Sequence, residues 1–136
     1  MDFDINTYLN YFKQMDFDIN TYLDSLSEDT KCIYLGGRNL TFIPSLERFK
    51  NLQTLYCSDN QLTSLPSLNE NLQTLNCSDN QLTSLPSLNE KLQTLNCQYN
   101  KLTSLPCLNE NLRVLICDNR CKFCEFLGVL LIISFS

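Results

Sequence analysis

Three consecutive stretches decide the fold. Residues 52–71 read LQTLYCSDNQLTSLPSLNEN, residues 72–91 read LQTLNCSDNQLTSLPSLNEK, and residues 92–111 read LQTLNCQYNKLTSLPCLNEN, a strict period of 20 residues. A looser 22-residue copy precedes them, and a further copy begins at Leu112 as LRVLICDN and then decays. A period of this length indicates repeat units that must stack, because no single unit can enclose its own apolar side chains.

The spacing inside one unit predicts a short strand followed by an extended return path. Leu55 and Cys57 are two residues apart, so on a strand both point into the core while Tyr56 points outward. Further along, leucines recur at intervals of three residues: Leu62, Leu65 and Leu68. This interval, with Pro66 inside it, suits a 3₁₀ or polyproline-like segment. The roughly ten remaining residues are too few for a whole α-helix, so we expect stacked parallel strands with irregular returns.

The unit Leu-x-x-Leu-x-Cys-x-x-Asn-x-Leu is the leucine-rich-repeat signature with cysteine at its third apolar position. The run SDNQLTSLPSLNENLQTL resembles the 20-residue bacterial-type repeats of secreted effector proteins of the YopM and IpaH kind. Similar arrays occur in proteins of giant DNA viruses. The resemblance covers residues 30–118 and implies a solenoid of the α/β horseshoe class, mostly parallel β with an irregular convex side and an α-helical N-terminal cap. Where that family often carries a second proline, this chain has Asn69, Asn89 and Asn109.

The N-terminal part, residues 1–29, contains an internal duplication. Residues 1–9 and 15–23 both read MDFDINTYL, and the offset of 14 keeps one helical stripe of apolar residues in phase. The stripe consists of Ile5, Tyr8, Phe12, Met15, Ile19, Tyr22 and Leu26. We interpret residues 5–27 as one or two amphipathic helices, with Asp4 or Asp18 as N-cap, that cover the open end of the first repeat. A two-heptad dimerisation arm is the alternative.

The C-terminal part, residues 119–136, breaks the repeat. Asn119 comes one position early, Lys122 stands where a leucine is expected, and the chain then runs FLGVLLIISFS. A membrane-spanning helix needs about 20 apolar residues, so we expect no membrane span here. We interpret this tail as an irregular cap over the last repeat; a poorly ordered remnant of a longer array is the alternative.

Composition argues against catalysis. The chain has no histidine, which excludes Ser-His-Asp and Cys-His arrangements and histidine metal ligands. The net charge of −5 belongs to residues 1–29, where seven acidic residues face one lysine, whereas residues 30–111 carry six bases and six acids. No basic face of useful size exists, so we expect no nucleic-acid partner. Because the chain opens with acidic residues rather than a secretory signal, we expect it in the cytoplasm or in host-cell cytosol, with reduced thiols.

Two columns of polar or reactive residues are assigned structural roles. Four of the eight cysteines occupy one core position: Cys57, Cys77, Cys97 and Cys117. Side chains that point in parallel cannot surround one zinc ion, so we expect buried thiols, no metal and no cofactor. A zinc site among Cys107, Cys117, Cys121 and Cys124, which include one Cys-x-x-Cys pair, is a weaker alternative. Surface oxidation of Cys121 or Cys124 is favoured over catalysis. The second column, which we expect to satisfy backbone groups at the strand ends, comprises Asn60, Asn80 and Asn100.

What remains for function is the outward face of the strands, the concave face of such a solenoid. We expect it to bind a protein partner, with tyrosines as anchors and Asp118 among the exposed flanking residues. The candidate binding residues are Tyr34, Tyr56, Ser58, Asp59, Asn76, Ser78, Asp79, Asn96, Gln98, Tyr99 and Ile116. The sequence thus predicts a monomeric, non-enzymatic protein-binding module. Alternatives are a structural or orphan repeat fragment without a specific partner and, less favoured, a cysteine-rich metal-binding protein.

Overall fold

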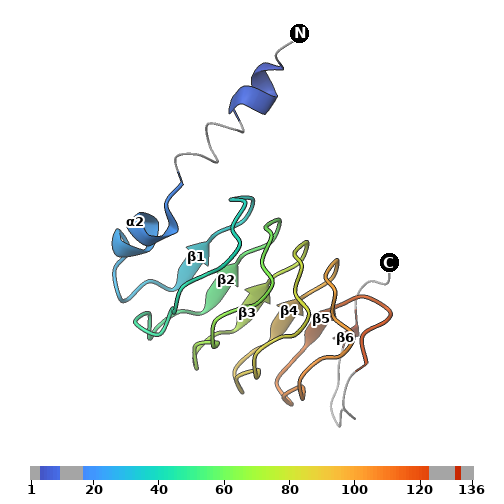
Figure 1. The fold of residues 1–136 in the computed structure, drawn as a ribbon. Helices are drawn as coiled ribbons and strands as arrows, with labels where there is room; N and C mark the ends of the chain where they lie inside the picture. Colours follow the sequence, from blue (N-terminus) through green and yellow to red (C-terminus); the bar gives the residue numbers. More distant parts are fainter. Residues whose placement is uncertain (1–3, 10–16, 123–130, 133–136) are drawn as a thin grey trace.

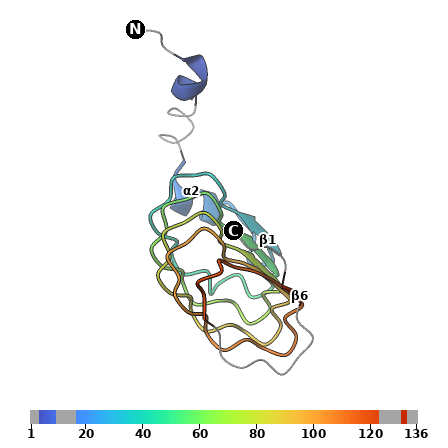
Figure 2. The ribbon, with the colours of Figure 1, turned by 90° about the vertical axis from the view of Figure 1, so that its right-hand side faces the viewer.

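The computed structural model describes residues 4–9, 17–122 and 131–132. Its strands form one parallel sheet in the order β1 to β6. They are β1 (Cys32–Tyr34), β2 (Thr54–Tyr56), β3 (Thr74–Asn76), β4 (Thr94–Asn96), β5 (Val114–Ile116) and β6 (Leu131–Ile132). Figure 1 shows the strands side by side like rungs, and in Figure 2 the successive turns overlie one another. The parallel solenoid predicted from the repeats is confirmed.

The register of the sheet follows directly from the 20-residue period. Equal spacing brings each residue beside its own equivalent, so Leu55 pairs with Leu75 and Leu75 with Leu95. Backbone hydrogen bonds then continue past each strand end, as where the Cys57 amide donates to the Asn76 carbonyl at 2.8 Å. A solenoid built in this way presents the same side chain at the same height in every turn.

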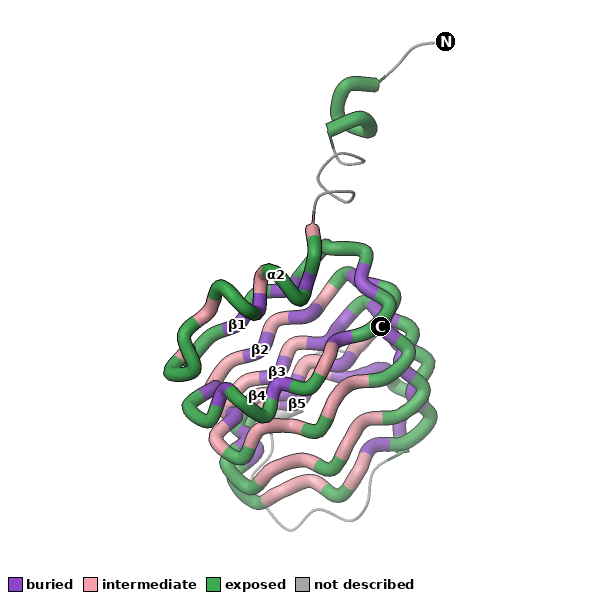
Figure 3. Tube along the Cα trace, turned by 60° about the vertical axis from the view of Figure 1, so that its left-hand side comes forward, coloured by how far each residue is buried: buried purple, intermediate pink, exposed green. Residues whose placement is uncertain are grey.

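The core is a narrow, filled layer of leucines and cysteines between the strands and their returns (Figure 3). The middle residue of each of β1–β5 is buried, and so is the cysteine or leucine two residues later, as the alternation predicts. The leucines of the returns that pack only partly buried against this core are Leu65, Leu68, Leu85, Leu88 and Leu108, whereas Leu105 is buried. Burying one leucine side chain contributes about 1.5–3 kcal/mol, so stability accumulates turn by turn.

The returns between β1 and β5 contain neither α-helix nor 3₁₀-helix, so the 3₁₀ form of the prediction is wrong, and they depend on a polar ladder that the sequence did not reveal. The Asn69 side-chain amide donates to the Leu46 carbonyl at 2.8 Å and to the Phe49 carbonyl at 3.0 Å. Two turns further along, the Asn109 side-chain amide likewise donates to the Asn89 carbonyl at 2.8 Å and to the Leu92 carbonyl at 3.1 Å. These asparagines occupy the place of the family's second proline and hold the irregular backbone with hydrogen bonds instead of a fixed φ.

A second ladder lies inside the turns that end the strands. The Asn80 side-chain amide donates to the Cys57 carbonyl at 2.9 Å, the Cys77 carbonyl at 3.2 Å and the Ser78 carbonyl at 3.1 Å. Its oxygen accepts the Leu62 amide at 3.0 Å. Asn60 and Asn100 make equivalent contacts one turn before and after. One buried side chain therefore joins two successive turns.

Replacing Asn80 by alanine tests this ladder. We expect Asn80→Ala to lower the free energy of unfolding by about 3 kcal/mol, because buried carbonyls and an amide lose their partner. Asn96→Ala on the outward face is the matched control and should cost less than about 0.5 kcal/mol. Urea denaturation of both variants measures the difference, and equal losses would contradict the role given to Asn80.

The N-terminal region forms two separate helical turns instead of one long helix. Helix α2 (Ile19–Asp24) begins after Asp18, whose side chain accepts the Asn20 amide and whose backbone is extended. A single continuous helix over residues 5–27 is therefore wrong, since the extended backbone of Asp18 interrupts it, whereas two helices agree with the described residues. The dimerisation arm stays a prediction. Residues 5–9 are helical as well, and the stripe residues Phe12 and Met15 lie outside the described part.

Only the second copy of the duplicated nine residues contacts the solenoid. Ile19 and Leu23 are buried in the common core, and Tyr22 and Leu26 pack against it. In the first copy the side chains of Ile5 and its neighbours are exposed, and Figure 1 draws that helical turn away from the strands. The expected covering of the first repeat is therefore made by α2 alone among the described residues.

At the other end of the array, the decayed copy is accommodated by a one-residue shift. Cys121 is buried, with its thiol 3.6 Å from the Leu102 carbonyl, so the prediction that it lies at the surface is wrong. It takes the core place that a leucine fills in the other turns, because Asn119 comes one position early. Beyond it, β6 adds a strand to β5 that the sequence did not predict. The remainder of the tail, including Cys124, lies outside the described residues.

Across the parts of the chain that the structure describes, no helix has the length and apolar character required to cross a membrane.

Candidate interaction face on the parallel strands

The outward side chains of β1–β5 form the surface that we call the strand face. Its central row follows from the strand register and consists of Tyr34, Tyr56, Asn76, Asn96 and Ile116. A parallel row of β-branched residues, Thr54, Thr74, Thr94 and Val114, lies beside it. The face is therefore aromatic at the β1 end, amide-bearing in the middle and aliphatic at β5.

Tyr34 and Tyr56 form the one aromatic pair of the strand face among the described residues. Their rings stack at 5.1 Å between centroids and 11° between planes, because neighbouring parallel strands hold equivalent side chains about 4.8 Å apart. Tyr34 is 58% exposed and Tyr56 is half-buried beneath it. Charge on the adjacent Cys32 raises the pKa of the Tyr34 hydroxyl, which stays a protonated donor at neutral pH. The stack is a fixed, exposed aromatic surface.

In the amide-bearing middle of the face, the Asn76 side chain is hydrogen-bonded within its own turn. The Asn76 side-chain oxygen accepts the Ser78 amide at 3.1 Å and the Ser78 hydroxyl at 2.9 Å. Ser78 is only 5% exposed in the free protein, and its hydroxyl donates to Asn76, so little of its surface is open to a partner. Ser58 and Gln98, at equivalent positions, remain half-exposed. Asn76 and Asn96 are thus oriented before any partner arrives.

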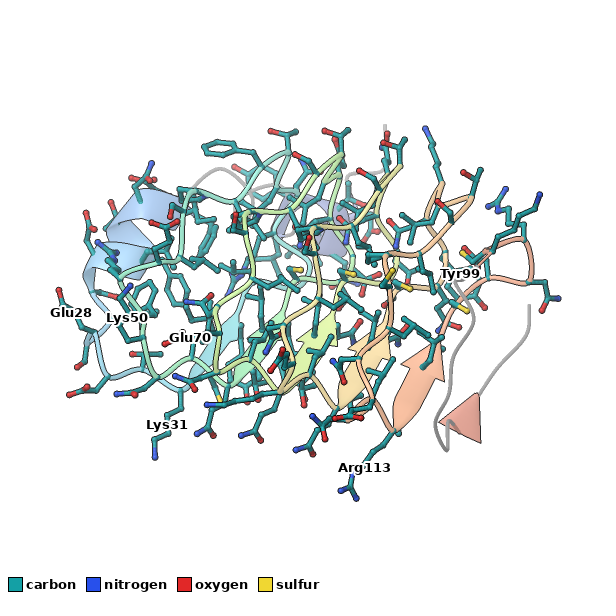
Figure 4. All side chains as sticks on the ribbon, turned by 90° about the horizontal axis from the view of Figure 1, so that it is seen from below. Glu28, Lys31, Lys50, Glu70, Tyr99 and Arg113 are labelled. Atoms are coloured by element: carbon teal, nitrogen blue, oxygen red, sulfur yellow. The ribbon has the colours of Figure 1, made fainter. Side chains whose placement is uncertain are left out.

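Asp59, Asp79 and Tyr99 lie at the turn where each strand ends, and not on the central row. All three have a left-handed backbone, with φ of 54°, 53° and 56°. Tyr99 is exposed, but it lies at the C-terminal end of the array, beside β5 in Figure 4. Because it stands two strands away from Tyr56 and three residues beyond Asn96, it is not adjacent to the tyrosine stack as predicted. The tyrosines therefore make two separate exposed places.

The left-handed backbone at Tyr99 yields a stability prediction. Asparagine and aspartate tolerate this conformation far better than a bulky residue does. We expect Tyr99→Asn to raise the free energy of unfolding by about 0.5–1 kcal/mol, measured by urea denaturation. The reciprocal Asp79→Tyr variant should lower it by a similar amount. A loss of stability in Tyr99→Asn would show that the tyrosine ring contributes more than its backbone costs.

The last turn replaces the asparagine ladder with an aspartate. Asp118 is buried, and its carboxylate accepts the Tyr99 amide at 2.9 Å and the Asn100 amide at 3.3 Å. Arg120 completes the turn by donating to the Asn100 carbonyl at 3.0 Å. The prediction that Asp118 is an exposed flanking residue is therefore wrong. Its carboxylate receives edge amides that a further repeat would otherwise bond through its backbone.

The cysteine column is buried, and its thiols have raised pKa values. Cys57, Cys77, Cys97 and Cys117 face the core, and Figure 4 shows sulfur atoms in a row along the array. Burial raises the pKa of Cys57 to about 12 and that of Cys117 to about 11, and it holds the pKa of Cys77 well above the ordinary thiol value. No group of three or more His, Cys, Asp or Glu side chains suited to a metal occurs within the described residues.

These raised values predict a loss of stability in alkaline solution. Thiols of the unfolded chain ionise near pH 8.5, whereas those of the folded column stay protonated, so alkali favours unfolding. We expect stability to be complete below pH 8 and then to fall, with Cys77 contributing up to about 1.4 kcal/mol per pH unit. Urea denaturation between pH 8 and 11 measures this. Cys77→Ala should flatten the profile, and Cys32→Ala, at an exposed position, should not.

The comparisons with known proteins agree with this geometry. The family model of leucine-rich repeats in two copies matches residues 70–110, and the single leucine-rich-repeat model matches residues 51–70. The first match covers β3 and β4, and the second covers β2. The strands, inward leucines and asparagine turns of these three repeats recur in register. Residues 51–110 of the chain are leucine-rich repeats. Its repeats are of the bacterial type, as their 20-residue length indicates.

Two solved structures show to what this leucine-rich-repeat protein is similar. YopM from Yersinia enterocolitica WA-314 matches with a TM-score of 0.69 and 29% identity, over 82% of this chain and 26% of that one. A leucine-rich-repeat domain of a Shigella effector matches with a TM-score of 0.68 and 24% identity, over 94% of this chain and 61% of that one. The chain therefore spans only part of either relative. No curated protein matches the sequence.

The leucine-rich-repeat fold is typically an interaction scaffold without catalytic groups, which suits what the described surface offers. Its exposed features are an aromatic stack, a row of threonines and oriented amides. Its reactive side chains are buried thiols with raised pKa values. Sequence reasoning found the rows of the strand face because they follow from the period, but it missed the burial of Ser78 and Asp118.

Proposed function

We propose that this leucine-rich-repeat protein is a non-enzymatic, monomeric protein-binding module that engages its partner through the strand face. The observation that carries the proposal is the stacked pair Tyr34 and Tyr56, of which Tyr34 is 58% exposed. Aromatic side chains dominate the energetics of protein interfaces, and a tyrosine loses little conformational entropy on binding. A stack already formed in the free protein reduces that cost further.

The rest of the strand face supports an extended polar contact next to this anchor. Thr54, Thr74 and Thr94 present hydroxyl groups at the strand spacing, and Asn76 and Asn96 present side-chain amides beside them. Residues 30–111 carry balanced charge, so the face supports recognition by shape and hydrogen bonds more than by electrostatic steering. We therefore infer a protein partner whose bound segment inserts an apolar or aromatic group at the tyrosines.

We place this function in a reducing compartment, the cytosol of the producing cell or of a host cell. The cysteines of the column are not joined by disulfides, and their thiols are buried in the core. Oxidising conditions would favour small disulfide-stapled domains, whereas this chain gains its stability from stacked turns.

A paired substitution of the stack tests the proposal. A partner is first identified by affinity purification and mass spectrometry, and its dissociation constant is then measured by calorimetry with purified proteins. We expect Tyr34→Ser, Tyr56→Ser to weaken binding by at least tenfold, about 1.4 kcal/mol, because the anchor is removed. Glu90→Gln, at an exposed turn on the edge of the solenoid, is the control and should bind as the wild type does.

Unchanged affinity in the tyrosine variant would overturn the assignment of the strand face. The alternative of a repeat fragment without a specific partner would be favoured by two results together. Affinity purification would recover the same proteins with wild type and with the tyrosine variant, and calorimetry would show that none of them binds directly.

A further inference from the structure

The two copies of MDFDINTYL have the same local structure in different surroundings. In the second copy the Asp18 carboxylate accepts the Asn20 amide at 3.0 Å and the Thr21 hydroxyl at 2.7 Å. In the first copy Asp4 accepts from Asn6 and Thr7, both at 3.0 Å. Both copies therefore begin a helical turn with the same cap, as their identical sequences dictate.

Their apolar side chains differ sharply in burial. Ile19 and Leu23 are 6% and 2% exposed, whereas the matching Ile5 and Leu9 are 69% and 52% exposed. An identical apolar face is thus covered in one copy and open to solvent in the other. Because solvation of such side chains is unfavourable, Ile5 and Leu9 of the first copy present to solvent the same apolar surface that docks in the second copy.

That partner is the site on the first repeat, residues 30–51, that α2 now occupies. Asn20 and Leu23 of α2 adjoin Pro44 and Ser45 around a shallow depression. The Asp24 carboxylate contacts the Arg48 guanidinium at 2.9 Å. Both charged groups are largely exposed, so the pair contributes little, and the buried apolar side chains provide most of the attachment.

We propose that the two copies compete for this one docking site, so that residues 5–9 occupy it when α2 leaves. The site recognises the apolar face of the helical turn, and both copies present that face with the same letters and the same cap. The first copy is a second capping segment on the same chain, which covers the open end of the core when α2 is undocked. This inference is independent of the proposed binding role of the strand face.

Chain connectivity makes α2 the preferred occupant. Seven residues separate the end of α2 from β1, and 21 separate the equivalent end of the first copy from β1. Closing the threefold longer loop is disfavoured by roughly fivefold on loop entropy. The first copy is also followed by Asn10 in place of Asp24, so it lacks the carboxylate that meets Arg48. Exchange therefore gives a minor state that grows when α2 is weakened.

Aspartate substitutions at the two matching leucines test the proposal by thermal unfolding of the full chain. We expect Leu9→Asp to change the Tm by less than about 1 °C, since Leu9 is exposed. Leu23→Asp should lower the Tm by only about 3 °C, the fivefold preference converted to temperature. The double variant should lose roughly 10 °C, because neither copy can then cover the core. Additive losses, or a Leu23→Asp chain that does not fold, would overturn the proposal.

Two further measurements separate exchange from simple tolerance of the substitution. Removing residues 1–14 should leave the wild-type Tm within about 1 °C but should lower that of Leu23→Asp to the level of the double variant. Hydrogen exchange should show amides of residues 5–9 gaining protection in Leu23→Asp. Equal melting of Leu23→Asp with and without residues 1–14 would overturn the proposal, and so would a Tm that rises with protein concentration, which indicates docking between chains.

Discussion

Where a short parallel strand ends and the chain turns inward, backbone carbonyls and amides face the core without a strand partner. Leaving such groups unbonded in an apolar interior costs free energy that a narrow core can ill compensate. In this protein one asparagine per turn resolves the problem, since its amide reaches carbonyls of its own turn and of the preceding one. The same side chain accepts an amide from the earlier turn, so each asparagine fixes the stacking of two units.

The other regularities follow from this fixed stacking. Turns held at one height place strand leucines, cysteines and outward residues in columns, and the cysteines become small buried apolar groups with raised pKa values. A second asparagine ladder on the returns, exemplified by Asn69, holds backbone that has neither helix nor second proline. On the outward side, the same spacing brings Tyr34 and Tyr56 into a stack before any partner is present. The proposed binding face therefore follows from the same stacking of turns that closes the core.

The ends of the array show what happens when no further identical unit is available. At the C-terminal end Asp118 receives amides that a neighbouring turn would otherwise bond, and Cys121 shifts by one position into a leucine place. At the N-terminal end α2 covers the first repeat with Ile19 and Leu23. The duplicated nine residues mean that the chain carries two segments able to perform this covering, although the space on the first repeat admits one.

The sequence by itself determined the repeat, the strand positions, the inward leucines and the class of fold, because a 20-residue period leaves one way to bury its apolar residues. It also indicated the central row of the strand face, since alternation assigns sides to strand residues. Only the tertiary structure decided which copy of MDFDINTYL docks, because the letters of the two copies are identical and their burial differs. It likewise decided that Ser78 and Asp118 are buried and that Tyr99 lies apart from the stack. The burial of Ser78 accompanies its hydrogen bond to Asn76 in the same turn, and that of Asp118 accompanies its hydrogen bonds to the preceding turn, and alternation along one strand predicts neither.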